Sequence, residues 1–199
     1  MPIRGLETAK TRLGGGLDPE ERLELVTALL RRTLRATRDA RSITGTVVVT
    51  MDPAAAGLAT SHGAIGLVER APGLNSAIEA GRSVAIARGA TALLVLPADI
   101  PGVSSEGLDE LANRALQAAT GRALVVLVPD QHGAGTNALL VSPPGAIAPR
   151  FGEGSREAHA EAARNAGATL VELSGPLSLD VDTPADLLAA ETALGAIDG

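Results

Sequence analysis

The chain has 199 residues, of which 45% are hydrophobic and 20% charged, and its formal net charge is −6 at pH 7. This length suits one domain with a substantial core, and the acidic balance argues against nucleic acid as a partner bound through a basic surface. The lack of cysteine excludes disulfides, thiolate metal sites and a cysteine nucleophile.

The N-terminal segment is cationic. It has no apolar signal-peptide core, and no later apolar run is long enough to span a membrane, so a cytoplasmic protein without a membrane partner is expected. Residues 2–13, P-I-R-G-L-E-T-A-K-T-R-L, place Arg4, Lys10 and Arg12 shortly before three glycines. Such a loop can wrap a polyphosphate, although it matches neither G-x-x-x-x-G-K-S/T nor G-x-G-x-x-G. By themselves these residues favour a solvated basic loop.

Strands and helices are expected to alternate along the rest of the chain. The first helix has a complete start signal, with Asp18 as N-cap, Pro19 at the first helical position and Glu21 closing a capping box. The expected helices span residues 18–40, 52–63, 72–89, 104–119 and 156–166, with a last one from 183. The expected strands span residues 44–50, 65–69, 93–96, 122–129, 138–141 and 168–173. This alternation predicts a single α/β domain, residues 1–199, with a mostly parallel central sheet flanked by helices.

The helix that opens in the segment P-G-L-N-S-A-I, residues 72–78, carries polar side chains at its start. Asn75 or Ser76 lies where free N–H groups and the positive end of the helix dipole favour an anion or a polar ligand edge. Simple capping of the helix would explain either residue equally well.

The segment A-L-L-V-L-P-A-D-I-P-G, residues 92–102, predicts a buried strand followed by a carboxylate. Leu93 to Leu96 form an unbroken apolar run, and Pro97 cannot continue a ladder of hydrogen bonds. Asp99 then lies just beyond the carboxyl end of the strand, where open α/β sheets bind ligands. A carboxylate there favours a cationic partner such as a divalent metal, while a cap on the turn before Ser104 is the alternative.

Two glycine-containing loops follow. In D-Q-H-G-A-G-T-N, residues 130–137, the glycines allow close approach to a ligand and Thr136 adds a polar contact. His132 in this loop could be a base or a metal ligand, but an exposed loop histidine is more often neither. In F-G-E-G-S, residues 151–155, Ser155 is the expected N-cap, and Gly152 with its neighbour Gly154 leaves the helix N-terminus open to a small carboxylate or phosphate.

A last acidic motif, L-D-V-D-T-P-A-D, covers residues 179–186. Asp180 and Asp182 are two positions apart, so in extended backbone their carboxylates share a face. Two like charges there repel each other unless a cation lies between them, which favours metal binding over a pair of turn acids. Because Asp99, both glycine loops and this pair all follow strand ends, we expect them to share one rim of the sheet.

Together these motifs resemble those of the guanylyltransferases that activate 2-phospho-L-lactate or phosphoenolpyruvate in the biosynthesis of the deazaflavin coenzyme F-420. The matching segments are residues 2–13, 17–22, 73–78, 96–101, 129–140, 151–155 and 180–187. The motif L-P-A-D alone is shared by many nucleotidyltransferases, whereas G-x-G-T-N-A-L-L followed by F-G-x-G-S is specific. The resemblance implies a Rossmann-like nucleotidyltransferase fold, related to that of the molybdopterin-guanine transfer enzymes.

The resemblance also implies a reaction, in which GTP gives its guanylyl group to the phosphate of a small phospho-acid and pyrophosphate leaves. It assigns two Mg²⁺ ions to Asp99, Asp180 and Asp182, and the acceptor to Thr136, Gly152 and Ser155. It places the nucleotide at Arg4, Lys10, Arg12, Gly73 and Asn75, and makes Lys10, Arg12 and Asp99 the catalytic set. The product would pass to a downstream transferase of the deazaflavin pathway.

Several alternatives remain open at this point. The chain could be a nucleotidyltransferase of the CTP, UTP or molybdopterin type, a sugar-nucleotide glycosyltransferase built on the D-x-D pair, or a non-catalytic nucleotide-binding module. The Arg-rich composition favours phosphoenolpyruvate as acceptor, and the oligomeric state stays open, with a homodimer as one option. Members of the family have a complete strand before the P-I-R-like segment, so we expect further residues upstream of Met1.

Overall fold

The computed structural model describes residues 1–3, 5–6, 17–69 and 73–179. Its helices are α1 (Pro19–Asp39), α2 (Pro53–Ser61), α3 (Leu74–Ala87), α4 (Ser105–Ala118) and α5 (Ser155–Asn165), with a 3₁₀ turn η2 (Pro176–Ser178). Its strands are β1 (Val47–Thr50), β2 (Ile65–Val68), β3 (Leu93–Val95), β4 (Leu124–Pro129), β5 (Thr136–Ser142) and β6 (Thr169–Glu172). The predicted α/β class is confirmed, and the helix expected from residue 183 lies outside the described residues.

The strands form two hydrogen-bonded groups. β1 pairs with β2 in parallel, and a second group has the order β3-β5-β4-β6, in which β4 and β6 are parallel. β5 departs from the expected parallel pattern because it runs antiparallel to both β3 and β4. The short connection of residues 130–135 explains this direction, since parallel neighbours need a crossover of a dozen residues or more. Consequently the start of β5, not its end, lies beside the end of β4.

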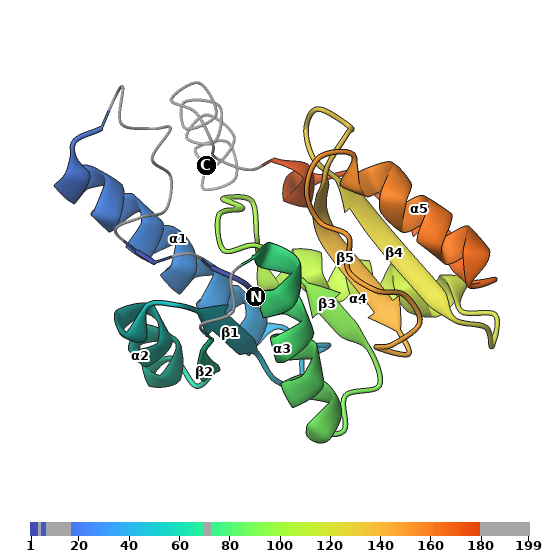
Figure 1. Ribbon diagram of the computed structural model, residues 1–199, viewed down its shortest axis with the longest axis horizontal. Helices are drawn as coiled ribbons and strands as arrows, with labels where there is room; N and C mark the ends of the chain where they lie inside the picture. The colour runs from blue at the N-terminus through green and yellow to red at the C-terminus, as the bar shows by residue number, and fades with distance from the viewer. Residues whose placement is uncertain (4, 7–16, 70–72, 180–199) are drawn as a thin grey trace.

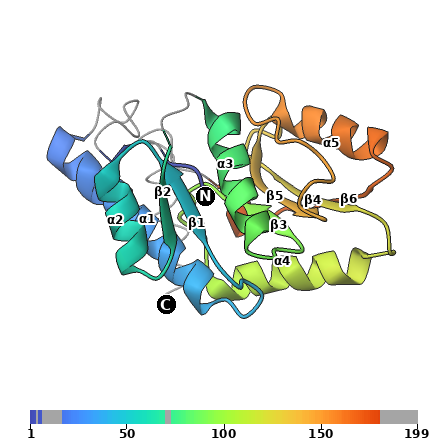
Figure 2. The ribbon, with the colours of Figure 1, turned by 60° about the horizontal axis from the view of Figure 1, so that its bottom comes forward.

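Helices cover both faces of the sheet, as Figures 1 and 2 show, with α3 and α5 on one side and α1 and α4 on the other. The side chains of β4 alternate between these layers. Val125 and Leu127 pack in the hydrophobic cluster that includes α3 and α5. Leu124, Val126 and Val128 pack in the cluster that includes α1 and α4. Burial on both faces explains why β4 is apolar throughout.

A cavity of about 430 Å³ lies between the two groups of strands, lined mainly by apolar side chains from β1, β3, α3 and α4. Residues 1–3 lie along the edge of β1 opposite β2, where the Val49 N–H donates to Met1 O at 2.9 Å. Figure 1 marks the N-terminus between β1 and β3. The ammonium of Met1 donates to Val47 O at 2.8 Å, and burial lowers the pKa of this amino group to about 5.

We expect an apolar strand of about five residues, added before Met1, to stabilise the protein, because it would fill this cavity and replace a buried terminal amino group by a peptide bond. A gain of about 2 kcal/mol would raise the melting temperature by about 4–8 °C in a chain of this size. Thermal unfolding measures the change, with a Gly-Ser extension of equal length as control. Equal melting temperatures for the two extensions would contradict the prediction. The expectation of residues upstream of Met1 stays a prediction.

Candidate active site

The loop between β4 and β5 is closed by its own first residue. The Asp130 carboxylate accepts from the Ala134 N–H at 3.0 Å, and the Asp130 carbonyl accepts from the Gly133 N–H at 3.0 Å. A Cβ on Gly135 would lie 2.4 Å from Asp130 Oδ2, so a side chain there would displace the carboxylate that holds the Ala134 N–H. The sequence predicts that a ligand approaches the backbone at these glycines; in the structure, the group close to Gly135 is the side chain of Asp130.

Arg156, on the first turn of α5, fixes this loop against the helix. Its Nη1 donates to Gly133 O at 3.0 Å, and its backbone N–H donates to Ala134 O at 3.1 Å. The guanidinium also pairs with Glu172 of β6 at 2.7 Å. Three contacts thus join the loop, α5 and β6 at one rim of the sheet. Arg156 was missed from the sequence because its partners come from other segments.

The turn before α5 differs from the prediction. Gly154, not Ser155, is the N-cap, and Ser155 is the first residue of the helix, only 2% exposed. The Ser155 N–H donates to Gly152 O at 3.1 Å, and the Arg156 N–H is taken by the loop. The expectation of open N–H groups is therefore wrong for the first two residues of α5. Gly152 has φ of +133°, a conformation that L side chains rarely adopt, so glycine is required there.

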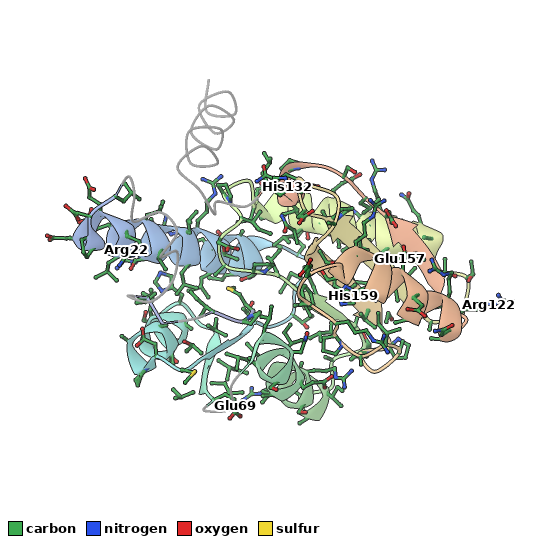
Figure 3. All side chains as sticks on the ribbon, turned by 45° about the horizontal axis from the view of Figure 1, so that its top comes forward. Arg22, Glu69, Arg122, His132, Glu157 and His159 are labelled. Carbon is green, nitrogen blue, oxygen red and sulfur yellow. The ribbon has the colours of Figure 1, made fainter. Side chains whose placement is uncertain are left out.

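His159 lies at the centre of these segments and is fully buried. Its Nδ1 lies 3.0 Å from Thr136 Oγ1, and its Nε2 accepts from the Arg150 N–H at 2.9 Å. Its ring meets that of Phe151 edge-on at 4.8 Å between centroids. Figure 3 shows His159 on the inner side of α5 and His132 at the edge of the molecule. The contacts of His159 bring Thr136, at the start of β5, to the segment that leads into Gly152 and Ser155.

The hydrogen bonds of His159 determine what chemistry it can do. Because Nε2 accepts from a backbone N–H, the ring proton must sit on Nδ1, which then donates to Thr136 Oγ1. Burial, with the nearby charge of Arg150, lowers the pKa of His159 to about 4, so the ring is neutral at pH 7. A ring with both nitrogens engaged in this way cannot take the proton of Thr136, which excludes a Thr–His nucleophile pair here.

Acidification is expected to weaken the fold through His159. The unfolded chain takes up the proton at a pKa near 6.5 and the folded chain only near 4, so this contribution is complete above pH 6.5 and is lost as pH falls to 4. The loss amounts to roughly 3 kcal/mol. Urea unfolding of wild type and His159→Gln at pH 7 and pH 4.5 measures it, and the stability difference between them should shrink at pH 4.5. A difference independent of pH would contradict the lowered pKa.

Asn75 clamps the same segment to α3. Its Oδ1 accepts from the Phe151 N–H at 2.8 Å, and its Nδ2 donates to Phe151 O at 3.0 Å. Arg82, further along α3, donates to Ile147 O at 3.2 Å, so residues 147–151 follow α3 towards its N-terminus. The cap of α3 is Gly73, so the capping alternative for Asn75 is wrong. The nucleotide-binding roles of Gly73 and Asn75 stay predictions.

If the resemblance holds, substituting Asn75 with Asp is expected to act on the predicted acceptor site at Gly152 and Ser155 more than on the predicted nucleotide site. The carboxylate keeps an acceptor for the Phe151 N–H but faces Phe151 O without a donor, which costs about 1–3 kcal/mol. With the substrates that the resemblance implies, steady-state kinetics should show a larger rise in the KM of the phospho-acid than in the KM of GTP. Ser76→Ala is the neighbouring control and should leave both constants unchanged. A rise confined to the KM of GTP would favour direct nucleotide binding by Asn75.

Asp99 follows β3 in a loop anchored to α1. Val103 O accepts from Arg32 Nε at 3.3 Å, and Ala98, Ile100 and Val103 of this loop are buried. The cap of α4 itself is Ser104, whose Oγ accepts from the Gly107 N–H at 3.0 Å. The metal role of Asp99 and the alternative that it caps the turn before Ser104 both stay predictions.

The chain returns to this loop just before the second acidic motif. A Cβ on Gly102 would meet Pro176 O at 2.6 Å, and Asn137 Nδ2 donates to Leu177 O at 3.2 Å. η2 therefore lies between the Asp99 loop and the start of β5. The predicted partners Asp180 and Asp182 lie outside the described residues, as do Arg4, Lys10 and Arg12. Within the described ranges, no three His, Asp or Glu side chains gather as a metal site.

No helix in the described part of the chain is both long enough and apolar enough to cross a membrane.

Comparison with known proteins adds a family and a fold. The family model described as "Guanylyl transferase CofC like" matches residues 1–192. A phosphoenolpyruvate guanylyltransferase of Sphaerobacter thermophilus is 41% identical, covering 98% of this chain and 94% of its own length. A phosphoenolpyruvate guanylyltransferase of Rubrobacter xylanophilus is 40% identical, and the match covers 98% of this chain and 93% of that protein.

Solved structures are similar in fold at low sequence identity. A nucleotide-diphospho-sugar transferase of Desulfovibrio desulfuricans has a TM-score of 0.71 at 16% identity, over 94% of this chain and 82% of that one. A 4-diphosphocytidyl-2C-methyl-D-erythritol synthase has a TM-score of 0.60 at 19% identity, over 97% of both. The predicted Rossmann-like nucleotidyltransferase fold is confirmed.

Proposed function

The chain belongs to the guanylyl transferase CofC-like family and is a nucleotidyltransferase with a guanylyltransferase role, and on that premise we propose its donor, acceptor and pathway. The donor is GTP and the acceptor is phosphoenolpyruvate, with 2-phospho-L-lactate as the second choice. Relatives about 40% identical over nearly the whole chain are named for phosphoenolpyruvate, which supports this order. The product would pass to a transferase of deazaflavin coenzyme F-420 biosynthesis.

The reaction joins two anions. An oxygen of the acceptor phosphate attacks the α-phosphorus of GTP, a P–O–P bond forms, and the bond to the β-phosphate breaks to release pyrophosphate. The attacking oxygen is already ionised at neutral pH, so no protein nucleophile or base is needed. This fits a site in which His159 is neutral and has both nitrogens engaged. The protein's task is to hold the two substrates in line and to offset the repulsion of their charges.

The acceptor site of the proposal consists of Thr136, Gly152 and Ser155. The observation that carries it is the bridge through His159, which bonds Thr136 on one side and the Arg150 N–H on the other. Ser155 lies one helical turn before His159 on the buried face of α5. A hydroxyl held beside a glycine turn suits a small carboxylate or phosphate, and the half-buried site excludes part of the solvent that would screen it.

Mg²⁺ is the proposed cofactor, with Asp99 as one ligand and Asp180 and Asp182 as the others. Carboxylate oxygens are the ligands that this hard cation prefers, so the donor set fits. The contact of η2 with Gly102 supports the grouping, because it brings the chain beside the Asp99 loop shortly before residue 180. The bound ion would offset negative charge on the phosphates, while Lys10 and Arg12 would hold those of GTP.

Pyrophosphate release tests the donor and the acceptor together. GTP, ATP, CTP and UTP are each offered with Mg²⁺ and with phosphoenolpyruvate, 2-phospho-L-lactate or 3-phosphoglycerate, and the next enzyme of the pathway removes product. Release is expected with GTP and phosphoenolpyruvate above every other pair. Release only with CTP or UTP would show that GTP is not the donor. Release only with 2-phospho-L-lactate would show that phosphoenolpyruvate is not the acceptor.

A further inference from the structure

Among the described residues, the hydroxyl of Thr136 contacts His159 and its proton has no other partner. Its Oγ1 accepts the proton of His159 Nδ1, because the other ring nitrogen is occupied by the Arg150 N–H. The hydroxyl's own proton must then be directed away from the ring. Thr136 is 7% exposed, so a ligand oxygen that approaches it replaces little bulk water. The result is a hydroxyl whose proton is directed away from the ring and is available to a ligand oxygen.

The second nitrogen of His159 controls the neighbouring segment. The Arg150 N–H is bonded to Nε2, and the next residue, Phe151, is held on both its N–H and its carbonyl by Asn75. These three bonds fix two successive residues directly before Gly152. One ring therefore sets both the proton direction of Thr136 and the entrance to the glycine turn.

We propose that His159 is a positioning residue for the acceptor: its Nδ1–H directs the Thr136 hydroxyl proton away from the ring, towards a carboxylate or phosphate oxygen of the acceptor, and its Nε2 holds the turn at Gly152 in register with that hydroxyl. This inference rests on the proposed function, because it takes Thr136 and Gly152 as acceptor contacts. His159 touches no reacting atom. It acts through Thr136 and through the backbone.

Two substitutions of His159 separate the two hydrogen bonds of the ring, and a third substitution removes the hydroxyl of Thr136. In His159→Asn the amide nitrogen occupies the region of Nδ1 and keeps the donor to Thr136, whereas in His159→Gln the amide oxygen reaches the region of Nε2 and keeps the acceptor for Arg150. Thr136→Val removes the hydroxyl. We expect Thr136→Val and His159→Gln to raise the acceptor KM about 10- to 100-fold and His159→Asn to raise it less, with the KM of GTP unchanged in all three.

The double variant His159→Gln/Thr136→Val decides whether the ring acts through the hydroxyl. The acceptor KM of the double variant should equal that of Thr136→Val alone, since the donor lost from the ring then has no partner. The proposal would be overturned if the rise in acceptor KM of the double variant were the product of the rises in the two single variants. It would also be overturned if the KM of GTP rose as much as that of the acceptor. Melting temperatures accompany the kinetics, so that a variant that fails to fold is recognised and His159→Asn decides in its place.

A spectroscopic measurement tests the proton position without turnover. ¹⁵N NMR of the histidine rings in the full chain should show His159 protonated at Nδ1 and bare at Nε2, with His159→Gln identifying its signals. The opposite tautomer would overturn the proposal. No turnover of wild type with any acceptor would instead reject the proposed function, and turnover with unaltered KM values in the variants would reject only the role of His159.

Discussion

Asp99→Asn is expected to lower kcat at least about 100-fold, because it removes a charged ligand from the proposed Mg²⁺ site; this corresponds to about 2.7 kcal/mol of transition-state stabilisation. The substitution replaces one carboxylate oxygen by an NH₂ group and leaves the volume of the side chain almost unchanged. The loop that carries it is anchored to α1 through Val103 O, and Ile100 and Val103 in the same loop are buried, so the fold should persist. Steady-state pyrophosphate release at several Mg²⁺ concentrations measures the effect, and a higher Mg²⁺ requirement should accompany it.

Asp39→Asn is the matched control. Asp39 ends α1, is exposed, and pairs with Arg38 at 2.8 Å, where one surface ion pair contributes little. The kcat and the Mg²⁺ requirement of the Asp39→Asn variant should equal those of wild type. An Asp99→Asn enzyme that turns over at the wild-type rate, with an unchanged melting temperature, would remove Asp99 from the metal site.

Gly152→Ala is expected to raise the KM of the phospho-acid about 10-fold or more and to destabilise the fold by about 1–3 kcal/mol, the cost of an L side chain in this backbone region. A Cβ on Gly152 has nothing within 4 Å, so space is not the obstacle. The obstacle is φ of +133° in the turn whose carbonyl accepts from the Ser155 N–H. Relaxing that turn would move the proposed acceptor contacts while leaving GTP binding intact.

Gly145→Ala provides the comparison, since a Cβ there also has nothing within 4 Å but the backbone is not in the positive-φ region. It should leave the KM values and the stability close to those of wild type. Chemical denaturation gives the stability and initial rates give the KM of each substrate. If Gly152→Ala and Gly145→Ala behaved alike, the turn at residue 152 would have no special part in acceptor binding.

Features that depend on near neighbours in the chain were predictable. The capping box at Asp18 and Glu21 forms as expected, with both bonds at 2.9 Å, because all its groups lie within four residues. The strand expected at residues 122–129 is found as β4, Leu124–Pro129, because an unbroken apolar run is typical of a strand covered on both faces. The direction of β5 could have been inferred from the short loop before it.

Features that depend on distant partners were not predictable from one sequence. Asn75 and Phe151 are 76 positions apart, and nothing local indicates that the amide of one holds the backbone of the other. Ser155 was expected to cap α5, but the helix begins one residue earlier because Gly154 adopts the left-handed conformation. His159 left one usable signal: it lies four residues after Ser155 and four before Ala163, so a polar ring falls on the buried face of α5.

The mass of the product tests the central claim most directly. Wild-type protein is incubated with GTP, Mg²⁺ and phosphoenolpyruvate whose phosphate carries ¹⁸O, and the products are analysed by mass spectrometry. The account predicts a compound that contains GMP joined to the intact labelled phospho-acid, together with unlabelled pyrophosphate. Free GMP with unreacted labelled phosphoenolpyruvate would show hydrolysis of GTP without transfer and would contradict the account.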